Sequence, residues 1–302
     1  MRIGVSLRDP SGPSPMTALR EELQRAADHG FASAWMSNIF GVDALTALAV
    51  AGNQVPRIEV GTAVIPTYPR HPAVLAQQAR TVAAAVDGRL ALGIGLSHQI
   101  VIEDMFGYDF SRPILHMREY LAVLLPLLDG RPVSFTGTTV RANITLSTPA
   151  PGRVPVVVAA LGPQMLRLAG EQTDGTVLWM TGPATVRDHV VPVITAGAEA
   201  AGRPSPRVVC ILPVCVTDDP DGARERASKV FAIYGQLPSY RAMLDREGAA
   251  GPADVAVVGD EDSVGAQIST LAEAGVTDFV AGEYTGGAEG ERTRAFLRTL
   301  LP

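Results

Sequence analysis

A small set of polar residues, with one glycine, stands directly after the short β-branched runs of this chain. They are Arg8, Asp9, Ser37, Asn38, Thr67, Tyr68, Arg70, His71, Ser97, His98, Gly162, Thr181, Glu283 and Tyr284. His98 is the first candidate for proton transfer, because the ordinary pKa of imidazole lies near neutrality. Asp9, Asn38 and Tyr284 are further candidate proton donors. These residue types suit acid–base assistance of a reaction, and His98 serves equally well as a hydrogen-bond donor to a cofactor.

Metal and disulfide chemistry are not indicated by the spacing of the histidines and cysteines. No H-x₃-H or C-x₂-C pair occurs, so the sequence predicts no metal site. Cys210 and Cys215 lie on one expected strand, which separates their Cα atoms by about 16 Å, too far for a disulfide. Both cysteines are therefore expected to be small buried residues.

Three stretches rich in glycine, alanine or proline mark places where the backbone can approach a ligand. Residues 61–72 contain three prolines, which stiffen a loop. Residues 92–98 contain Gly93 and Gly95, which admit a planar ring or a phosphate close to the backbone but lack the third glycine of a dinucleotide fingerprint. Residues 159–163 form a small-residue turn before a helix, whose first backbone N–H groups can bind an anion.

Short β-branched runs alternate with Ala- and Leu-rich amphipathic stretches along the whole chain, which is the pattern of repeated βα units. Strands are predicted at residues 3–7, 32–36, 58–64, 89–93, 156–159, 176–179, 208–214 and 278–281. Helices are predicted at residues 17–29, 44–51, 72–86, 111–128, 163–171, 184–201, 220–234, 263–274 and 292–300. Eight such units predict an α/β fold, the (β/α)8 or TIM barrel, in which active sites lie at the carboxyl ends of the strands.

Two of the βα units are stretched. Residues 95–111 form a long, partly irregular connection, and residues 129–155 include a predicted hairpin near 133–137. Long connections in compact domains commonly bind ligands or act as lids. We therefore expect one barrel domain over residues 1–302, with an insertion segment at about 95–155 after the fourth strand.

The composition and charge indicate which classes of binding partner this protein can have. The chain is 47% apolar and 5% aromatic, so its core must be built from Ala, Val, Leu and Ile. A net charge of −6 without a long basic run argues against nucleic acid. The first residues turn polar by Ser6 and Arg8, unlike a signal peptide, and no apolar run approaches the roughly 20 residues of a membrane span. We expect a cytoplasmic protein that acts on a small-molecule substrate.

The chain resembles the luciferase-like monooxygenase superfamily, in particular its branch of F420-dependent oxidoreductases. The resemblance covers essentially the whole chain and is most specific at residues 61–72, 93–98, 112–128 and 159–175. It implies a (β/α)8 barrel with an insertion after the fourth strand, and a flavin-type cofactor, either the deazaflavin coenzyme F420 or, alternatively, FMN. It also implies a non-prolyl cis peptide bond between Ala63 and Val64, behind the cofactor ring.

The family pattern assigns roles to individual positions. It places Ala63 and Val64 against the ring, and Ser97 and His98 near the phosphate-bearing side chain of the cofactor. The amides implied for the phosphate are those of Ala160, Leu161 and Gly162. The phosphate and the acidic tail also need positive charge, for which the available donors are Arg70, His71, Arg112, His116 and Arg167. A solvated helix face explains Arg112, His116 and Arg118 equally well.

The resemblance implies hydride transfer between the deazaflavin and a small organic substrate. Sugar-phosphate dehydrogenases of the superfamily carry a histidine and a glutamate where this chain has Ile39 and His98, so glucose-6-phosphate oxidation is not expected. Reduction of an unsaturated or carbonyl compound fits better, with His98, Asn38 or Asp9 assisting catalysis. An FMN-dependent monooxygenase on the same barrel is the alternative, and a non-catalytic flavin- or deazaflavin-binding protein is the second alternative. A homodimer is implied by the family resemblance.

Overall fold

The strands and helices of the chain follow one another as the sequence predicts. A computed structural model describes residues 1–10, 12–148 and 152–301. All eight predicted strands are present, each within two residues of its expected bounds. The chain divides into two compact units. The single domain over residues 1–302 stays a prediction.

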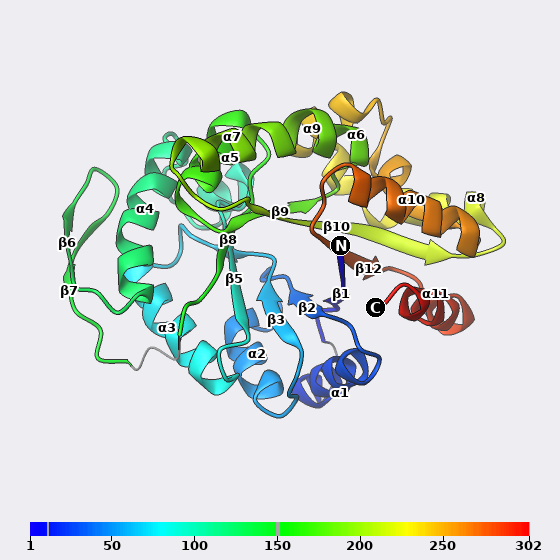
Figure 1. The fold of residues 1–302 in the computed structure, drawn as a ribbon, viewed down its shortest axis with the longest axis horizontal. Helices are drawn as coiled ribbons and strands as arrows, with labels where there is room; N and C mark the ends of the chain where they lie inside the picture. The colour runs from blue at the N-terminus through cyan, green and yellow to red at the C-terminus, as the bar shows by residue number, and fades with distance from the viewer. Residues whose placement is uncertain (11, 149–151, 302) are drawn as a thin grey trace. The chain divides into compact units, whose positions relative to one another are not determined.

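The first unit comprises Met1–Leu7, Asp28–Trp35 and the chain from Ala160 onward. Its strands are β1 (Arg2–Leu7), β2 (Ser33–Met36, which extends one residue beyond the unit), β9 (Gly175–Trp179), β10 (Arg207–Val216), β11 (Val257–Gly259) and β12 (Asp278–Glu283). Its helical segments are α5 (Pro163–Gln172), α6 (Pro183–Thr185), η2 (Val186–Val190), α7 (Val191–Ala200), α8 (Pro220–Val230), η3 (Ala232–Gly235), α9 (Pro238–Glu247), η4 (Pro252–Val255), α10 (Glu261–Glu273) and α11 (Gly287–Thr299). The long strand β10 pairs in parallel with β9, β11 and β12, and β12 pairs in parallel with β1 (Figure 1).

Strand β10 is buried along its whole length after Arg207, because its residues are β-branched or apolar and it has strand neighbours on both sides. Pro213 in its interior lacks the N–H that a sheet requires. The pairing with β9 ends at Ile211 and the pairing with β11 begins at Val214. The proline therefore falls at the change of partner, where a missing donor costs least.

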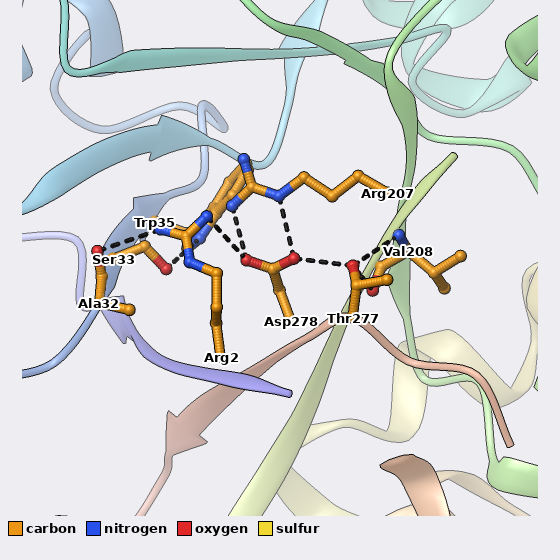
Figure 2. A network of polar contacts seen from close by, with 8 residues as sticks. All are labelled: Arg2, Ala32, Ser33, Trp35, Arg207, Val208, Thr277 and Asp278. Atoms are coloured by element: carbon orange, nitrogen blue, oxygen red, sulfur yellow. Dashed lines mark hydrogen bonds and ion pairs between the residues drawn. The ribbon is translucent and has the colours of Figure 1, made fainter. Parts of the chain in front are cut away.

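A buried carboxylate joins the amino ends of strands in this unit (Figure 2). Asp278, the first residue of β12, is 2% exposed and accepts two hydrogen bonds from Arg207, from Nη2 at 2.7 Å and from Nε at 3.0 Å. Arg2 Nη1 lies 3.2 Å from the same carboxylate. The Arg207 guanidinium also lies 5.4 Å over the ring of Trp35, whose Nε1 donates to Ser33 Oγ at 3.0 Å. The network lies at the amino ends of the strands, whereas active sites of such barrels lie at the carboxyl ends. We therefore assign the network a role in stability.

The second unit comprises Arg8–Ala27 and Met36–Ala159. Its elements are α1 (Pro15–Asp28, whose last residue lies beyond the unit), α2 (Ala44–Gly52), β3 (Glu59–Thr62), β4 (Ile65–Pro66), α3 (Pro72–Ala85), β5 (Leu90–Gly95), η1 (Val101–Met105), α4 (Pro113–Leu128), β6 (Val133–Thr136), β7 (Arg141–Ile144) and β8 (Val156–Val158). Strand β5 is central and pairs in parallel with β3, β4 and β8. The carboxyl ends of these strands therefore lie along one edge.

The predicted hairpin is the antiparallel pair β6–β7, which lies beside α4 (Figure 1). Glu119 of α4 holds its turn. Its carboxylate accepts the backbone N–H groups of Thr138 at 2.7 Å, Thr139 at 2.6 Å and Val140 at 3.1 Å, and the Thr139 hydroxyl at 2.7 Å. These donors lower the pKa of Glu119 to about 2 against the opposing effect of desolvation. The hairpin is thus fastened to α4, the helix that precedes it in the chain.

Some helices and strands were not predicted from the sequence, and one helix was predicted longer than it is. Strand β11, helix α9 and the short segments η1 and η4 were not predicted. The helix predicted at 220–234 ends at Val230, because Phe231 and Tyr234 turn their rings edge-on to Trp179, at centroid distances of 5.6 and 5.7 Å. Cys210 and Cys215 are buried free thiols, as predicted.

Within the described ranges no helix combines the length and apolarity needed to cross a membrane. In the same ranges no group of three or more His, Cys, Asp or Glu side chains is arranged to hold a metal ion.

Candidate active site

The peptide bond between Ala63 and Val64, at the break between β3 and β4, is cis, which confirms the sequence-based expectation. Ala63 N–H donates to the carbonyl oxygen of Met36 at 2.8 Å. On the other side, the Thr62 hydroxyl donates to Gly93 O at 2.8 Å and accepts from Gly93 N at 2.9 Å. The break between β3 and β4 is therefore fastened to Met36, the last residue of β2, and to the interior of β5.

Gly95, the last residue of β5, lies where three strand ends meet. A Cβ at this position would lie 2.6 Å from Val64 Cγ2 and 3.1 Å from Ala159 Cβ. The sequence suggested that this glycine admits a ligand. In the structure, Val64 occupies the space that a side chain at Gly95 would fill. Val64, the residue after the cis bond, can therefore reach the carboxyl edge of the strands.

Ser97 and His98 follow β5 directly. Ser97 has a φ of 63°, a left-handed conformation that is uncommon for serine and is frequently found at functional sites. The carbonyl oxygen of His98 accepts the N–H groups of Val101 at 2.9 Å and Ile102 at 3.0 Å, which begins the π-helical segment η1. Burial lowers the pKa of the His98 imidazole below its ordinary 6.5. His98 is therefore a neutral hydrogen-bonding group at neutral pH.

Ala160, Leu161 and Gly162 connect β8 to α5. Their backbone N–H groups donate to no acceptor in the part of the chain that the structure describes. Gly162 is the N-cap of α5, no side chain caps the helix, and its first turn contains no acidic residue. Gly162 is exposed and a Cβ there would meet nothing within 4 Å, so the surroundings of this residue are open. Free amides at a helix N-terminus form an anion site.

Three other helical segments of the same unit begin differently, whereas α9, like α5, has no side-chain cap and no acidic residue in its first turn. The first amides of α6 bind the carboxylate of Glu247, at 3.1 Å from Ala184 N and 2.7 Å from Thr185 N. Asp219 and Asp260 cap α8 and α10 through their own side chains. Since these three segments already have a carboxylate at the N-terminus, α5 is better suited than they are to bind an anionic group of a ligand.

Asn38 and Asp9, both predicted to assist catalysis, follow β2 and β1. Asn38 Oδ1 accepts Ala44 N–H at 2.9 Å, at the start of α2. Asp9 is exposed and its carboxylate lies so close to Gly41 that a Cβ there would overlap it. Asn38 thus has a structural task at the start of α2, and Asp9 packs against the loop that follows β2.

The comparison with known proteins decides the family. Residues 1–278 match the family model described as luciferase-like monooxygenase. The chain belongs to the luciferase-like monooxygenase family. Its predicted membership is therefore confirmed.

The individual relatives are distant in sequence, but their alignments cover nearly the whole of this chain. A 5,10-methylenetetrahydromethanopterin reductase from Methanolobus tindarius is 27% identical over 303 residues, covering 90% of this chain and 92% of the relative. The structure of a coenzyme F420-dependent tetrahydromethanopterin reductase from Methanopyrus kandleri matches with a TM-score of 0.83 at 23% identity, over 98% and 97% of the two chains.

A further solved structure carries a different cofactor. The oxygenating constituent of 3,6-diketocamphane monooxygenase from Pseudomonas putida, in complex with FMN, matches with a TM-score of 0.77 at 18% identity, over 100% of this chain and 97% of that one. Such likenesses, with the family match, show the fold. It is the predicted (β/α)8 barrel, with the insertion following β5.

In this luciferase-like protein the two candidate cationic residues after β4 already have partners. Arg70 forms an ion pair with Asp43, the N-cap of α2. His71 is the N-cap of α3: its Nδ1 accepts Ala73 N–H at 3.2 Å, and its Nε2 lies 3.0 Å from the carbonyl oxygen of Arg141. A carbonyl only accepts, so Nε2 is the donor and the imidazole is fixed as one tautomer. Their predicted role at the cofactor tail stays a prediction.

His116 was expected either to bind the cofactor or to lie on a solvated helix face with Arg112 and Arg118. Both arginines are exposed, but His116 is 9% exposed and stacks on Tyr68. Thr67, fully buried, lies 3.0 Å from His116 Nε2 through its hydroxyl. The solvated-face interpretation is therefore wrong for His116, because the helix turns this position inward. The spacing of Arg112 and His116 in the sequence does not indicate that the two side chains take different faces. That difference could have been predicted only with knowledge of the elements that α4 packs against.

Aromatic rings gather at the carboxyl ends of β9 and β12. Trp179 ends β9, and Tyr284 follows β12, with Phe231 packed edge-on between them at 5.6 Å from each. The Tyr284 hydroxyl donates to the carbonyl oxygen of Ala223 at 3.0 Å, and burial raises the pKa of Tyr284 well above its ordinary 10. Tyr284 is therefore held by the chain itself and is a weaker candidate for proton donation than His98.

Proposed function

We propose that this protein is an oxidoreductase that uses coenzyme F420 to reduce a small unsaturated or carbonyl compound. The proposal extends the family membership to the cofactor named for the Methanopyrus kandleri structure and to the reductase activity named for the Methanolobus tindarius relative. The substrate class rests on the departures from the sugar-phosphate dehydrogenase pattern at Ile39 and His98.

The observation that carries the proposal is the uncapped start of α5. Three consecutive amides, from Ala160 to Gly162, lack acceptors among the described residues and precede a helix without an acidic first turn. A phosphate diester fits such a donor set, because it supplies negative charge and several acceptor oxygens to N–H groups that otherwise have none. The residues present therefore suit the phosphate of F420, and we assign them to it.

When bound, F420 supplies the hydride, and the chain supplies orientation and hydrogen bonding. Ala63 and Val64 are assigned to the ring and Ser97 to the cofactor side chain. His98, kept neutral by its lowered pKa, is assigned to donate a hydrogen bond to the substrate rather than to act as a charged acid. A neutral imidazole can polarise a carbonyl in this way.

The test is direct binding of F420 and of FMN to the purified protein, followed by fluorescence and then by turnover. We expect saturable binding of F420 and oxidation of reduced F420 in the presence of enones, imines or ketones. Binding of FMN without a response to F420 would replace the proposal by the monooxygenase alternative, which the likeness to the FMN complex favours. Binding of F420 without turnover of any of these classes would favour the non-catalytic alternative.

A further inference from the structure

His189 lies in the π-helical segment η2 and is buried, at 8% exposed. Charged residues precede it directly in the sequence, yet its side chain is turned inward. Its Nε2 lies 2.8 Å from the carbonyl oxygen of Leu161, which precedes the start of α5. A carbonyl oxygen only accepts, so Nε2 carries the proton and donates. The extra residue per turn of a π-helix changes which face a side chain takes, and such segments recur at functional sites.

This hydrogen bond controls the direction of one of the phosphate-binding amides. The carbonyl of Leu161 and the N–H of Gly162 belong to the same planar peptide unit, in which the two groups point in opposite directions. A bond that holds Leu161 O toward His189 therefore turns Gly162 N–H away from His189. Gly162 has the open surroundings in which an anion can approach this N–H.

The helix that carries His189 is itself fixed against α5. Figure 1 shows α5 and α7 side by side, and they approach at two glycines. A Cβ at Gly197 would lie 2.6 Å from the carbonyl oxygen of Arg167, and one at Gly170 would lie 2.9 Å from Ala198 N. The first amides of α6, at the start of the same helical run, bind the carboxylate of Glu247. Since both helices are held backbone to backbone, the Nε2 of His189 has a defined position relative to Leu161.

We propose that His189 is a positioning residue for cofactor binding, which orients the Leu161–Gly162 peptide so that the Gly162 N–H faces the cofactor phosphate. The inference rests on the proposed function, since it assumes a phosphate-bearing cofactor at the start of α5. It concerns the phosphate and not the ring, so it predicts an effect only on cofactors that carry the phosphate.

The experiment compares dissociation constants for cofactor pairs that differ in the phosphate: F420 against its phosphate-free deazaflavin precursor, and FMN against riboflavin. The His189→Leu variant removes the donor and keeps a buried side chain. We expect about tenfold weaker binding of the phosphate-bearing cofactor, the scale of one lost hydrogen bond, and an unchanged affinity for its phosphate-free partner. The His189→Gln variant retains an N–H donor and should recover part of the loss.

Thr185→Val is the matched control, because Thr185 lies on the same helical run and its hydroxyl donates to a carbonyl of α9, Met243 O, at 3.2 Å. It should leave the ratio of the two dissociation constants unchanged. An equal loss for both members of a pair in His189→Leu would show a merely structural role and overturn the inference, as would no loss at all. If the wild-type protein binds FMN and not F420, the proposed cofactor fails while the FMN and riboflavin pair still tests His189. If it binds none of the four compounds, both proposals fall.

Discussion

The imidazole ring of His116 lies parallel to the phenol ring of Tyr68, with 3.9 Å between the ring centroids and 6° between the planes. The hydroxyl of Thr67 binds the Nε2 of the same imidazole. Burial lowers the pKa of His116 to about 4. Burial, together with the nearby carboxylates of Asp109 and Glu103, raises the pKa of Tyr68 to about 12. Both rings are thus neutral at neutral pH, and α4 is joined to the loop after β4 by a stack without charge.

The first prediction concerns acid stability. The unfolded chain protonates His116 near its ordinary pKa of 6.5, whereas the folded chain does so near 4. The free energy of unfolding should therefore fall as the pH decreases from 6.5 toward 4, because the unfolded state binds the additional proton. The double variant Thr67→Val, His116→Phe removes the titrating ring and its partner and should flatten this dependence. Urea unfolding at several pH values measures it, and an unchanged slope would contradict the assignment.

The second prediction concerns the carboxylate at the amino ends of the strands. Asp278→Asn should lower the free energy of unfolding by about 3 kcal/mol, because it leaves the Arg207 guanidinium partly buried without its counter-charge. Asp188→Asn is the control. Asp188 pairs with Arg187 at 2.7 Å, but both side chains are more than half exposed, so its loss should change the free energy of unfolding far less than the loss of Asp278. Chemical denaturation measures both, and equal effects would contradict the view that burial decides the contribution.

The third prediction concerns Val64. The methyl group of Gly95→Ala would lie 2.6 Å from Val64 Cγ2, so Val64 must move. Overpacking of this kind costs about 1–3 kcal/mol of stability. If Val64 lies against the cofactor ring, the variant should also weaken the binding of phosphate-free and phosphate-bearing cofactors alike. Gly251→Ala is the control, since a Cβ there meets nothing within 4 Å and φ is −161°. Cofactor titration of both variants provides the measurement.

The fourth prediction concerns the pH dependence of reduction. Because burial lowers the pKa of His98 below 6.5, its imidazole is neutral throughout the range above that value. A neutral hydrogen-bond donor gives a rate that is constant above pH 6.5 and changes only as the pH falls through the lowered pKa. A rate that instead declines steadily above pH 6.5 would indicate a charged acid. His98→Ala should reduce kcat by about 100-fold, with cofactor binding retained.

The strand ends could be read from the sequence because βα units repeat in it. The β-branched runs and the glycines and prolines that bound them indicated eight strands, and the polar residues following those strands included Ser97 and His98. The family resemblance indicated the cis bond at Ala63–Val64, and the small residues 159–163 indicated the turn before α5. Strand β11 escaped, because it has only two β-branched residues before a glycine, whereas the equally short β8 is a run of three valines.

What the sequence by itself determined is the succession of elements and the positions at which their carboxyl ends fall, since these depend on local periodicity and on breaker residues. Only the tertiary structure decided which polar side chains remain available. Arg70 is paired with Asp43 and both nitrogens of His71 are engaged, whereas His189, which follows two charged residues in the sequence, is buried and directed at Leu161. The physical reason is that a hydrogen bond between residues far apart in the chain depends on how helices pack, and packing is not encoded at any single position.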